Sequence, residues 1–266
     1  MEYLTLNNGM QMPLLGFGTW DVRGDSGKRS ILDALELGYR LIDTARMYEN
    51  EAMVGAAMRE SGLDRAELFL TTKLHRLCAD YHSAKAGIEC SLNELQTDYI
   101  DLLLIHEPYE HALEMYQAMQ EAYQQGKVKA LGISNFNAAE YSDFLCNCGL
   151  VPAVNQVESH VYHTQLTLQN LLQKNGTQMQ SWAPFTQGRR NLFAEPVLNR
   201  IGTQYQKTAA QVALRFLVQH HIAVIPKSVH RVRMAENFAI FDFELSQEDI
   251  AQIACLDEAC SLFGWY

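Results

Sequence analysis

The feature that most constrains the fold is a strand and helix alternation that repeats along nearly the whole chain. Short apolar runs suited to buried strands alternate with segments whose apolar residues recur every three to four positions, as in helices. Each unit takes about 30 residues, as βαβ units do. The eight expected strands are residues 14–19, 41–42, 68–74, 99–105, 128–133, 154–157, 179–182 and 222–225.

Eight such units predict an α/β protein whose parallel sheet closes into a (β/α)8 TIM barrel. An open doubly wound sheet is the alternative. That fold commonly carries a GxGxxG nucleotide fingerprint, but Gly16-Phe-Gly18 is a lone GxG without the third glycine, so the barrel is favoured. No linker, charge block or low-complexity stretch divides the chain, and we expect residues 1–266 to form a single domain.

The residues before the first barrel strand predict a β-hairpin cap. Leu4 and Leu6 alternate with polar residues, and Met10 and Met12 resume the alternation. Between them, Asn8-Gly9 is typical of a two-residue type I′ turn.

Composition excludes several classes of function. Lys and Arg number 21 against 31 Asp and Glu, so the formal charge of −10 disfavours nucleic acid and anionic membrane surfaces as partners. The N-terminus lacks a leader pattern and no apolar run is long enough to cross a membrane, so we expect a cytoplasmic protein. The six cysteines are scattered without CxxC spacing, so we expect reduced thiols and no metal.

Four polar residues fall at the carboxyl ends of successive expected strands or in the loop beyond. Asp43 follows the second strand with Tyr48 in its loop, Lys73 lies near the end of the third, and His106 ends the fourth. Each alone has an ordinary structural explanation: a helix cap, an aromatic packed in a loop, a lysine reaching solvent from a strand end, or a core histidine whose ring is hydrogen-bonded. Together they predict one polar cluster at the barrel mouth, where such folds place active sites.

The cluster suits proton transfer to a carbonyl. An adjacent ammonium favours phenolate, so we expect Lys73 to lower the pKa of Tyr48. Asp43 would hold Lys73, and His106 would donate a hydrogen bond to the carbonyl oxygen. The cluster supplies no nucleophile, and a hydride from a nicotinamide would serve.

Seven motifs, in order, resemble the aldo-keto reductase family, especially small bacterial members described as 2,5-diketo-D-gluconate reductases. They are GFGTW (16–20), DTARMYENE (43–51), TTKL (71–74), DYIDLLLIHEP (98–108), GKVKALGISNF (126–136), VNQVESHVYH (154–163) and IPKSVHRVRMAENF (225–238). The resemblance implies a (β/α)8 barrel that binds NADPH and reduces small aldehydes or ketones to alcohols. It implies a catalytic tetrad of Asp43, Tyr48, Lys73 and His106, with Tyr48 as the proton donor.

The resemblance also implies a cofactor site. Ser134, Asn135 and Gln156 match residues that bind the nicotinamide carboxamide, and Trp182 matches the aromatic under the ring. Lys227, Ser228 and Arg233 match the clamp on the adenosine 2′-phosphate, and a lysine, a hydroxyl and an arginine after the last strand suit an anion by their chemistry. The remaining residues assigned to the cofactor site are Gly18, Thr19, Glu236 and Asn237.

Two departures from the family pattern concern the substrate. Where the family often has Trp-Pro after the catalytic histidine, this chain has Glu107-Pro108, which should widen the pocket and disfavour anionic substrates if the carboxylate points inward. Trp20 is expected to line the pocket. The C-terminal tail is short, and its aromatic residues Phe263, Trp265 and Tyr266 are compatible with packing on the mouth or on another subunit.

Two other functions, and either of two oligomeric states, are compatible with the same residues. A cofactor-binding regulatory subunit of this fold with little turnover is the second functional hypothesis, disfavoured by the complete tetrad. A non-redox or metal-dependent barrel enzyme is the third, but we expect His160 and His163 to be surface residues rather than ligands. Monomer and homodimer are both compatible with the sequence.

Overall fold

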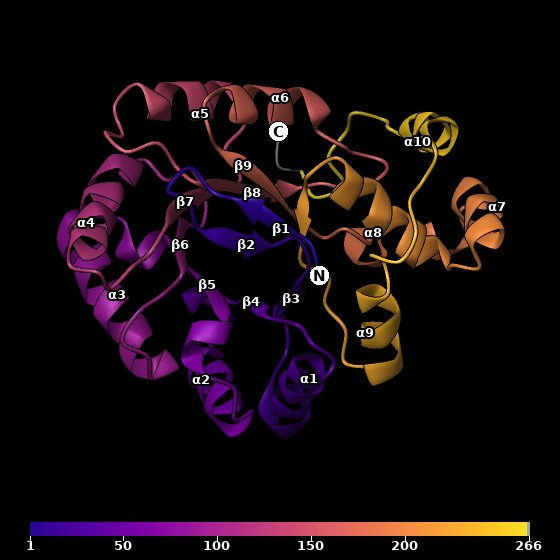
Figure 1. Cartoon of the computed structure of the whole chain (residues 1–266). Coiled ribbons are helices and arrows are strands. Elements are labelled where there is room, and N and C mark those ends of the chain that lie inside the picture. Colours follow the sequence, from indigo (N-terminus) through magenta and orange to yellow (C-terminus); the bar gives the residue numbers. More distant parts are fainter. Residues whose placement is uncertain (265–266) are drawn as a thin grey trace.

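Eight parallel strands form the centre of the molecule, in the order in which they occur along the chain. The structure is a computed structural model that describes residues 1–264. Figure 1 shows the strands at the centre with the helices around them. The strands are β3 (Gly16–Gly18), β4 (Leu41–Asp43), β5 (Phe69–Leu74), β6 (Leu102–Ile105), β7 (Leu131–Ser134), β8 (Val154–Glu158), β9 (Gln178–Trp182) and β10 (Ala223–Val224).

The first and last strands meet, so the sheet closes on itself. Leu15 bridges Val224 in parallel orientation, and the Val224 amide donates to the Leu14 carbonyl at 2.8 Å. Further along, the Gly18 amide donates to the Pro226 carbonyl at 3.2 Å. The predicted (β/α)8 barrel is thereby confirmed, and the open sheet is excluded. Several strands are shorter than expected, among them β3 and β10. At β6 and β7, residues 100 and 128 make only an isolated bridge before the strands begin.

Helices cover the outside of the barrel, as the alternating pattern predicts. The capping boxes at Thr208 and Ser246 begin two of them, satisfying backbone amides that have no partner within the helix. The helices are α1 (Gly24–Glu36), α2 (Glu51–Glu60), α3 (Tyr81–Leu95), α4 (Ala112–Gln124), α5 (Ala138–Leu145), α6 (Leu166–Lys174), α7 (Pro196–Tyr205), α8 (Ala209–Gln219), α9 (Arg231–Phe238) and α10 (Gln247–Ala254).

The N-terminal hairpin forms, but its turn differs from the expected one. β1 (Tyr3–Thr5) pairs antiparallel with β2 (Gln11–Pro13). The turn spans Leu6 to Gly9, whose amide donates to the Leu6 carbonyl at 2.9 Å, and Gly9 has a φ of +86° while Asn8 does not enter the positive region. The type I′ prediction was therefore wrong, because the loop is longer than two residues and needs one left-handed position rather than two.

The hairpin covers the amino ends of the barrel strands, opposite the expected active site. The Asn8 side chain donates to the Lys129 carbonyl before β7, and Gln178 at the start of β9 donates to the Thr5 carbonyl. In Figure 1 the hairpin lies across the middle of the barrel. The opposite end, where the strands finish, is left for the loops that line the cavities described below. Within residues 1–264, no helix is long and apolar enough to cross a membrane.

Candidate active site

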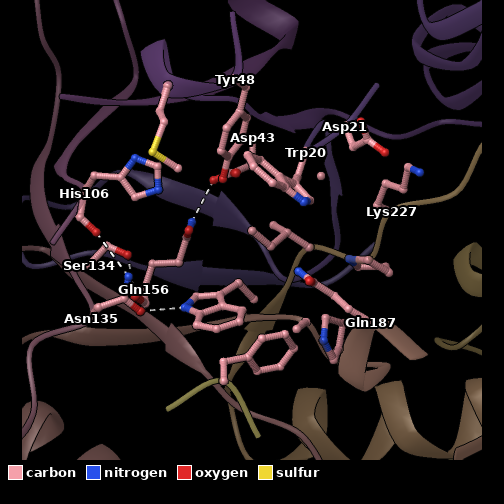
Figure 2. A pocket seen from close by; sticks show the side chains of 18 of the residues that line it. Trp20, Asp21, Asp43, Tyr48, His106, Ser134, Asn135, Gln156, Gln187 and Lys227 are labelled. Carbon is pink, nitrogen blue, oxygen red and sulfur yellow. Dashed lines mark hydrogen bonds between the residues drawn. The ribbon is translucent and has the colours of Figure 1, made fainter. Parts of the chain in front are cut away.

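The four residues of the expected catalytic cluster converge at the carboxyl ends of neighbouring strands. Asp43 ends β4, Lys73 lies in β5, His106 follows β6, and Tyr48 ends the short 3-10 helix η1 (Arg46–Tyr48) beyond β4. Because β4, β5 and β6 are parallel neighbours in register, their ends meet at one rim. Asp43, Tyr48 and His106 line one cavity of about 520 Å³. Figure 2 shows these three side chains together.

Lys73 is at the centre of the cluster and is completely buried. Its Nζ donates to Asp43 Oδ1 at 2.5 Å, to the Thr44 carbonyl at 3.0 Å and to the Tyr48 hydroxyl at 3.4 Å. Burial disfavours the ammonium, but the Asp43 carboxylate and the contact with Tyr48 outweigh it, so the pKa of Lys73 is raised. Burial likewise raises the pKa of the Asp43 carboxyl, opposed by the Lys73 charge and by Gln156. The three hydrogen bonds give every N–H of this ammonium an acceptor.

Tyr48 differs from the sequence-based expectation. Burial raises the pKa of its phenol, and this effect exceeds the lowering by the Lys73 charge. The expected net lowering was wrong, because the sequence shows the neighbouring charge but not the loss of water around the hydroxyl. A raised pKa keeps the phenol protonated at neutral pH. Since the hydroxyl oxygen already accepts from Lys73, its own proton is left for another acceptor.

His106 is buried and neutral. Burial lowers the pKa of its imidazole to about 3, and the Lys73 charge acts in the same direction. Its ring lies edge-on to that of Tyr48, with centroids 5.8 Å apart. Within residues 1–264 its Nδ1 has no hydrogen-bond partner. A neutral imidazole beside a protonated phenol can orient a carbonyl oxygen without adding a second positive charge next to Lys73.

Gln156 joins the cluster to the expected nicotinamide site. From β8 its Nε2 donates to Asp43 Oδ2 and to Gln180 Oε1, both at 2.7 Å. Ser134 donates to the Gln156 carbonyl at 2.8 Å. Asn135, with a φ of +64°, donates to the His106 carbonyl and accepts from Trp182 Nε1 at 2.7 Å. These residues line the same cavity, and Figure 2 shows Ser134, Asn135 and Gln156 together at one side of it.

A second cavity of about 850 Å³ lies beyond β10 and contains the expected phosphate clamp. Lys227 and Phe185 line both cavities, so the two share a boundary. Among the described residues, Lys227 and Arg233 take part in no ion pair, whereas the neighbouring Arg231 pairs with Asp33 and Glu36. The other expected cofactor residues that line this cavity are Ser228, Glu236 and Asn237.

Most of the remaining expected site residues reach the first cavity, and one does not. Gly18, Trp20 and Glu107 line it, with Trp20 packed edge-on against Tyr48 at 5.0 Å. Thr19 lines neither cavity: it is buried, and its hydroxyl donates to the Asp43 carbonyl at 2.9 Å. Thr19 thus holds the end of β4 rather than facing the cavity.

Sequence inspection missed several lining residues because they lie in loops without a recognisable chemical pattern. Phe185 and Gln187 follow β9, in a segment where Ala183, Thr186 and Gln187 have positive φ. Their position directly after a barrel strand was the available signal. The other lining residues not anticipated are Asp21, Met47, Ala183, Pro184, Ile225 and Pro226.

The two histidines expected at the surface are buried instead. His160 is fully buried and His163 is 8% exposed. The end of the chain covers this region, with Ser261 and Leu262 contacting Glu158, which explains the error. Phe263 packs on Trp182 and lines the cavity, while Trp265 and Tyr266 lie outside the described residues. Within residues 1–264, no group of three or more potential ligands could hold a metal ion.

Fold and site together define a barrel with a buried pair of an acid and a lysine, a half-buried tyrosine beside it, and two adjoining cavities. Comparison with known proteins identifies its family. Residues 14–258 match the model of the Aldo/keto reductase family, and the chain belongs to that family of enzymes.

Relatives match along almost the whole chain. Glyoxal reductase of Bacillus subtilis is 41% identical over 97% of this chain and 93% of its own length. Methylglyoxal reductase DkgA of Escherichia coli is 37% identical over 96% of this chain and 93% of its own. The crystal structure of MGS-M4, an aldo-keto reductase from a deep-sea metagenome library, superposes with a TM-score of 0.95 at 37% identity, over 97% and 96% of the two chains. An aldo-keto reductase complexed with NADPH superposes with a TM-score of 0.92 at 32% identity, over 98% and 89%.

The lowered pKa of His106 predicts a pH-dependent stability. The unfolded imidazole binds a proton near pH 6.5, whereas the folded one does so only near 3, so its stabilisation is present above 6.5 and is lost as the pH falls. His106→Gln should therefore lose less free energy of unfolding than the wild type between about pH 6.5 and 4.5, by at most about 1.4 kcal/mol per pH unit. Urea denaturation across this range measures it, with the exposed His82→Gln as the matched control. Equal slopes for His106→Gln and wild type would contradict the assignment.

Proposed function

We propose that this protein reduces small aldehydes and ketones to alcohols, with NADPH as the hydride donor and Tyr48 as the proton donor. The observation that carries the proposal is the Tyr48 hydroxyl, which meets the buried Lys73 ammonium at 3.4 Å beside the cavity that Trp182 and Gln156 line. The names of relatives, a glyoxal reductase and a methylglyoxal reductase, agree with small carbonyl substrates. Both cavities belong to one barrel, so we propose that residues 1–266 act as one domain.

The residues present fit NADPH. The Gln156 amide oxygen forms no hydrogen bond among the described residues, so it is left to accept from a carboxamide, while its nitrogen is held by Asp43 and Gln180. Trp182 is held by Asn135 and lines the cavity. Lys227 and Arg233, which form no ion pair with any described residue, line the second cavity and suit a phosphate. Similarity to a reductase complexed with NADPH supports the same cofactor.

The side chains of this protein supply the proton and orient the substrate. When bound, NADPH supplies a hydride to the carbonyl carbon. Tyr48 gives its proton to the carbonyl oxygen, and Lys73 stabilises the phenolate that remains, which offsets the cost of charging a desolvated group. Asp43 keeps Lys73 in place. Neutral His106 orients the carbonyl oxygen by donating a hydrogen bond, and Trp20 packs edge-on against the Tyr48 ring.

Tyr48→Phe tests the proton donor. The change removes the acidic proton while keeping the ring, so turnover with glyoxal or methylglyoxal should fall by about 10²- to 10⁴-fold, the usual contribution of a general acid. NADPH binding, followed by fluorescence, should be retained. Tyr123→Phe, on α4 away from both cavities, is the matched control. Full turnover by Tyr48→Phe would exclude this role, and NADPH binding without turnover by the wild type would favour a regulatory subunit.

The clamp in the second cavity leads to a prediction on cofactor choice. Arg233→Ala should raise the Kd of NADPH by about 10- to 100-fold, as expected for loss of a charge-assisted contact with the 2′-phosphate, and should leave the Kd of NADH unchanged. Arg231→Ala is the matched control, because Arg231 lies on the same helix but is already paired with Asp33 and Glu36. The same Kd of NADPH for Arg233→Ala and wild type would show the clamp to be wrong.

Glu107 favours neutral or cationic carbonyls over anionic ones. The residue is half-buried and lines the cavity next to His106. Burial raises the pKa of its carboxyl, and the nearby Arg76 opposes that change. A carboxylate beside the reacting carbonyl would repel the carboxylate of a keto acid, more strongly in a partly desolvated cavity than in water.

Glu107→Gln tests this preference. The change removes the charge at nearly constant size, so kcat/KM for a keto acid should rise by about 3- to 30-fold relative to its neutral ester, corresponding to roughly 1–2 kcal/mol of repulsion. Steady-state NADPH oxidation with the two substrates measures the ratio. Glu110→Gln, exposed in the same loop and outside the cavity lining, controls for general charge. A wild-type preference for the keto acid would overturn the proposal.

A further inference from the structure

The last described residues of the chain return to the barrel mouth after α10. The Glu258 amide donates to the Tyr162 carbonyl at 3.0 Å, and the Glu258 side chain pairs with Arg190. Three residues later the chain reaches the end of β8. This segment, residues 258–264, is called the tail below.

A buried carboxylate, Glu158, binds the tail at this point. Glu158, the last residue of β8, is fully buried. Its Oε2 accepts from Ser261 Oγ at 2.5 Å, and its Oε1 accepts from the Leu262 amide at 2.8 Å and from His160 Nε2 at 3.0 Å. Burial alone would raise the pKa of Glu158, but these donors outweigh it and lower the pKa. The anchor is therefore a charged acceptor whose strongest contacts, after His160, come from the tail itself.

The anchored tail places one aromatic side chain at the cavity. Phe263 packs edge-on against Trp182 with ring centroids 4.9 Å apart, and it lines the same cavity as Tyr48 and His106. Arg189 covers the other side: its guanidinium lies 4.4 Å from the Phe263 ring centre, and its Nη1 donates to the Leu262 carbonyl at 3.0 Å. Glu158 thus binds the tail, and the tail places Phe263 against the Trp182 ring.

We propose that Glu158 is a positioning residue that sets substrate size selection, by fixing the tail so that Phe263 forms a wall of the carbonyl pocket. The inference rests on the proposed reductase function for its kinetic part only. Glu158 touches none of the proposed catalytic groups, so it acts through the tail. Aromatic or bulky carbonyls, which reach this wall, depend on the anchor, whereas a two-carbon dialdehyde does not.

Tail mobility can be measured without any substrate. Glu158→Gln places an amide N–H₂ against one of the tail donors, and Ser261→Ala removes a donor while leaving the buried strand intact in case Glu158→Gln fails to fold. Both changes should speed hydrogen exchange of the tail peptide by at least about tenfold, because a charge-assisted hydrogen bond to its backbone is lost or weakened. Glu258→Gln is the matched control, since it removes the tail's exposed ion pair, which contributes little. Unchanged exchange in both Glu158→Gln and Ser261→Ala would overturn the anchor.

Kinetics then separate positioning from catalysis. With phenylglyoxal, Glu158→Gln, Ser261→Ala and Phe263→Ala should raise KM by about 3- to 10-fold with kcat nearly constant, as expected for losing an aromatic contact made equally in ground and transition states. With glyoxal, KM should stay constant. An equal rise in KM for both substrates, or a fall in kcat alone, would contradict the role of Phe263 as a wall of the pocket. Absence of NADPH oxidation by the wild type would defeat the proposed function instead, and the exchange experiment would still decide the anchor.

Discussion

The ion pair between Lys73 and Asp43 is the interaction on which the site depends. Both side chains are almost completely buried, and their charged atoms lie 2.5 Å apart. Buried charges are costly unless every donor and acceptor has a partner, and removing one member of such a pair typically costs several kcal/mol. Here the remaining partners are the Thr44 carbonyl, the Tyr48 hydroxyl and the Gln156 amide. The hydrogen bonds that make burial of this ion pair tolerable are therefore the same ones that hold Lys73 beside the Tyr48 hydroxyl.

Only a closed barrel brings all of these partners to the buried ion pair. Asp43 ends β4 and Gln156 lies in β8, four strands further along the sheet, yet their side chains meet at 2.7 Å. In an open sheet these strands would be separated by the full width of three others. The bridge between Leu15 and Val224 that closes the sheet is thus part of what positions Lys73 beside Tyr48. Closure also brings the mouth loops around one cavity, and burial there keeps His106 neutral and Tyr48 protonated.

Sequence patterns predicted the barrel and the convergence of Asp43, Tyr48, Lys73 and His106, because both depend on strand periodicity and on strand ends. They failed where burial decides the outcome. The pKa of Tyr48 is raised rather than lowered, since desolvation does not show in a list of neighbours. His160 is a buried partner of Glu158 rather than a surface residue, because the tail that covers it is about 100 positions away in sequence. The left-handed backbone after β9 likewise gave no residue signal, as its positive φ angles fall on Ala183, Thr186 and Gln187 rather than on glycine.

Some residues at the cavity lie in the sheet, whereas others lie in a loop or in the tail. This difference indicates which positions can change substrate specificity without moving Lys73 or Tyr48. Lys73, Asp43 and Gln156 are held by the sheet, so their relative positions follow from strand register. Glu107 and Phe263 lie beyond the sheet, in a loop and in the tail, and they contact the cavity without taking part in the hydrogen bonds of Lys73. Under the proposed function, a change at either position alters which substrates the cavity admits and leaves Tyr48 beside Lys73. The proposed catalytic side chains are thus positioned by the barrel strands and the loop after β4, whereas the side chains proposed to select the substrate lie in a loop and in the tail, which can change without altering the sheet.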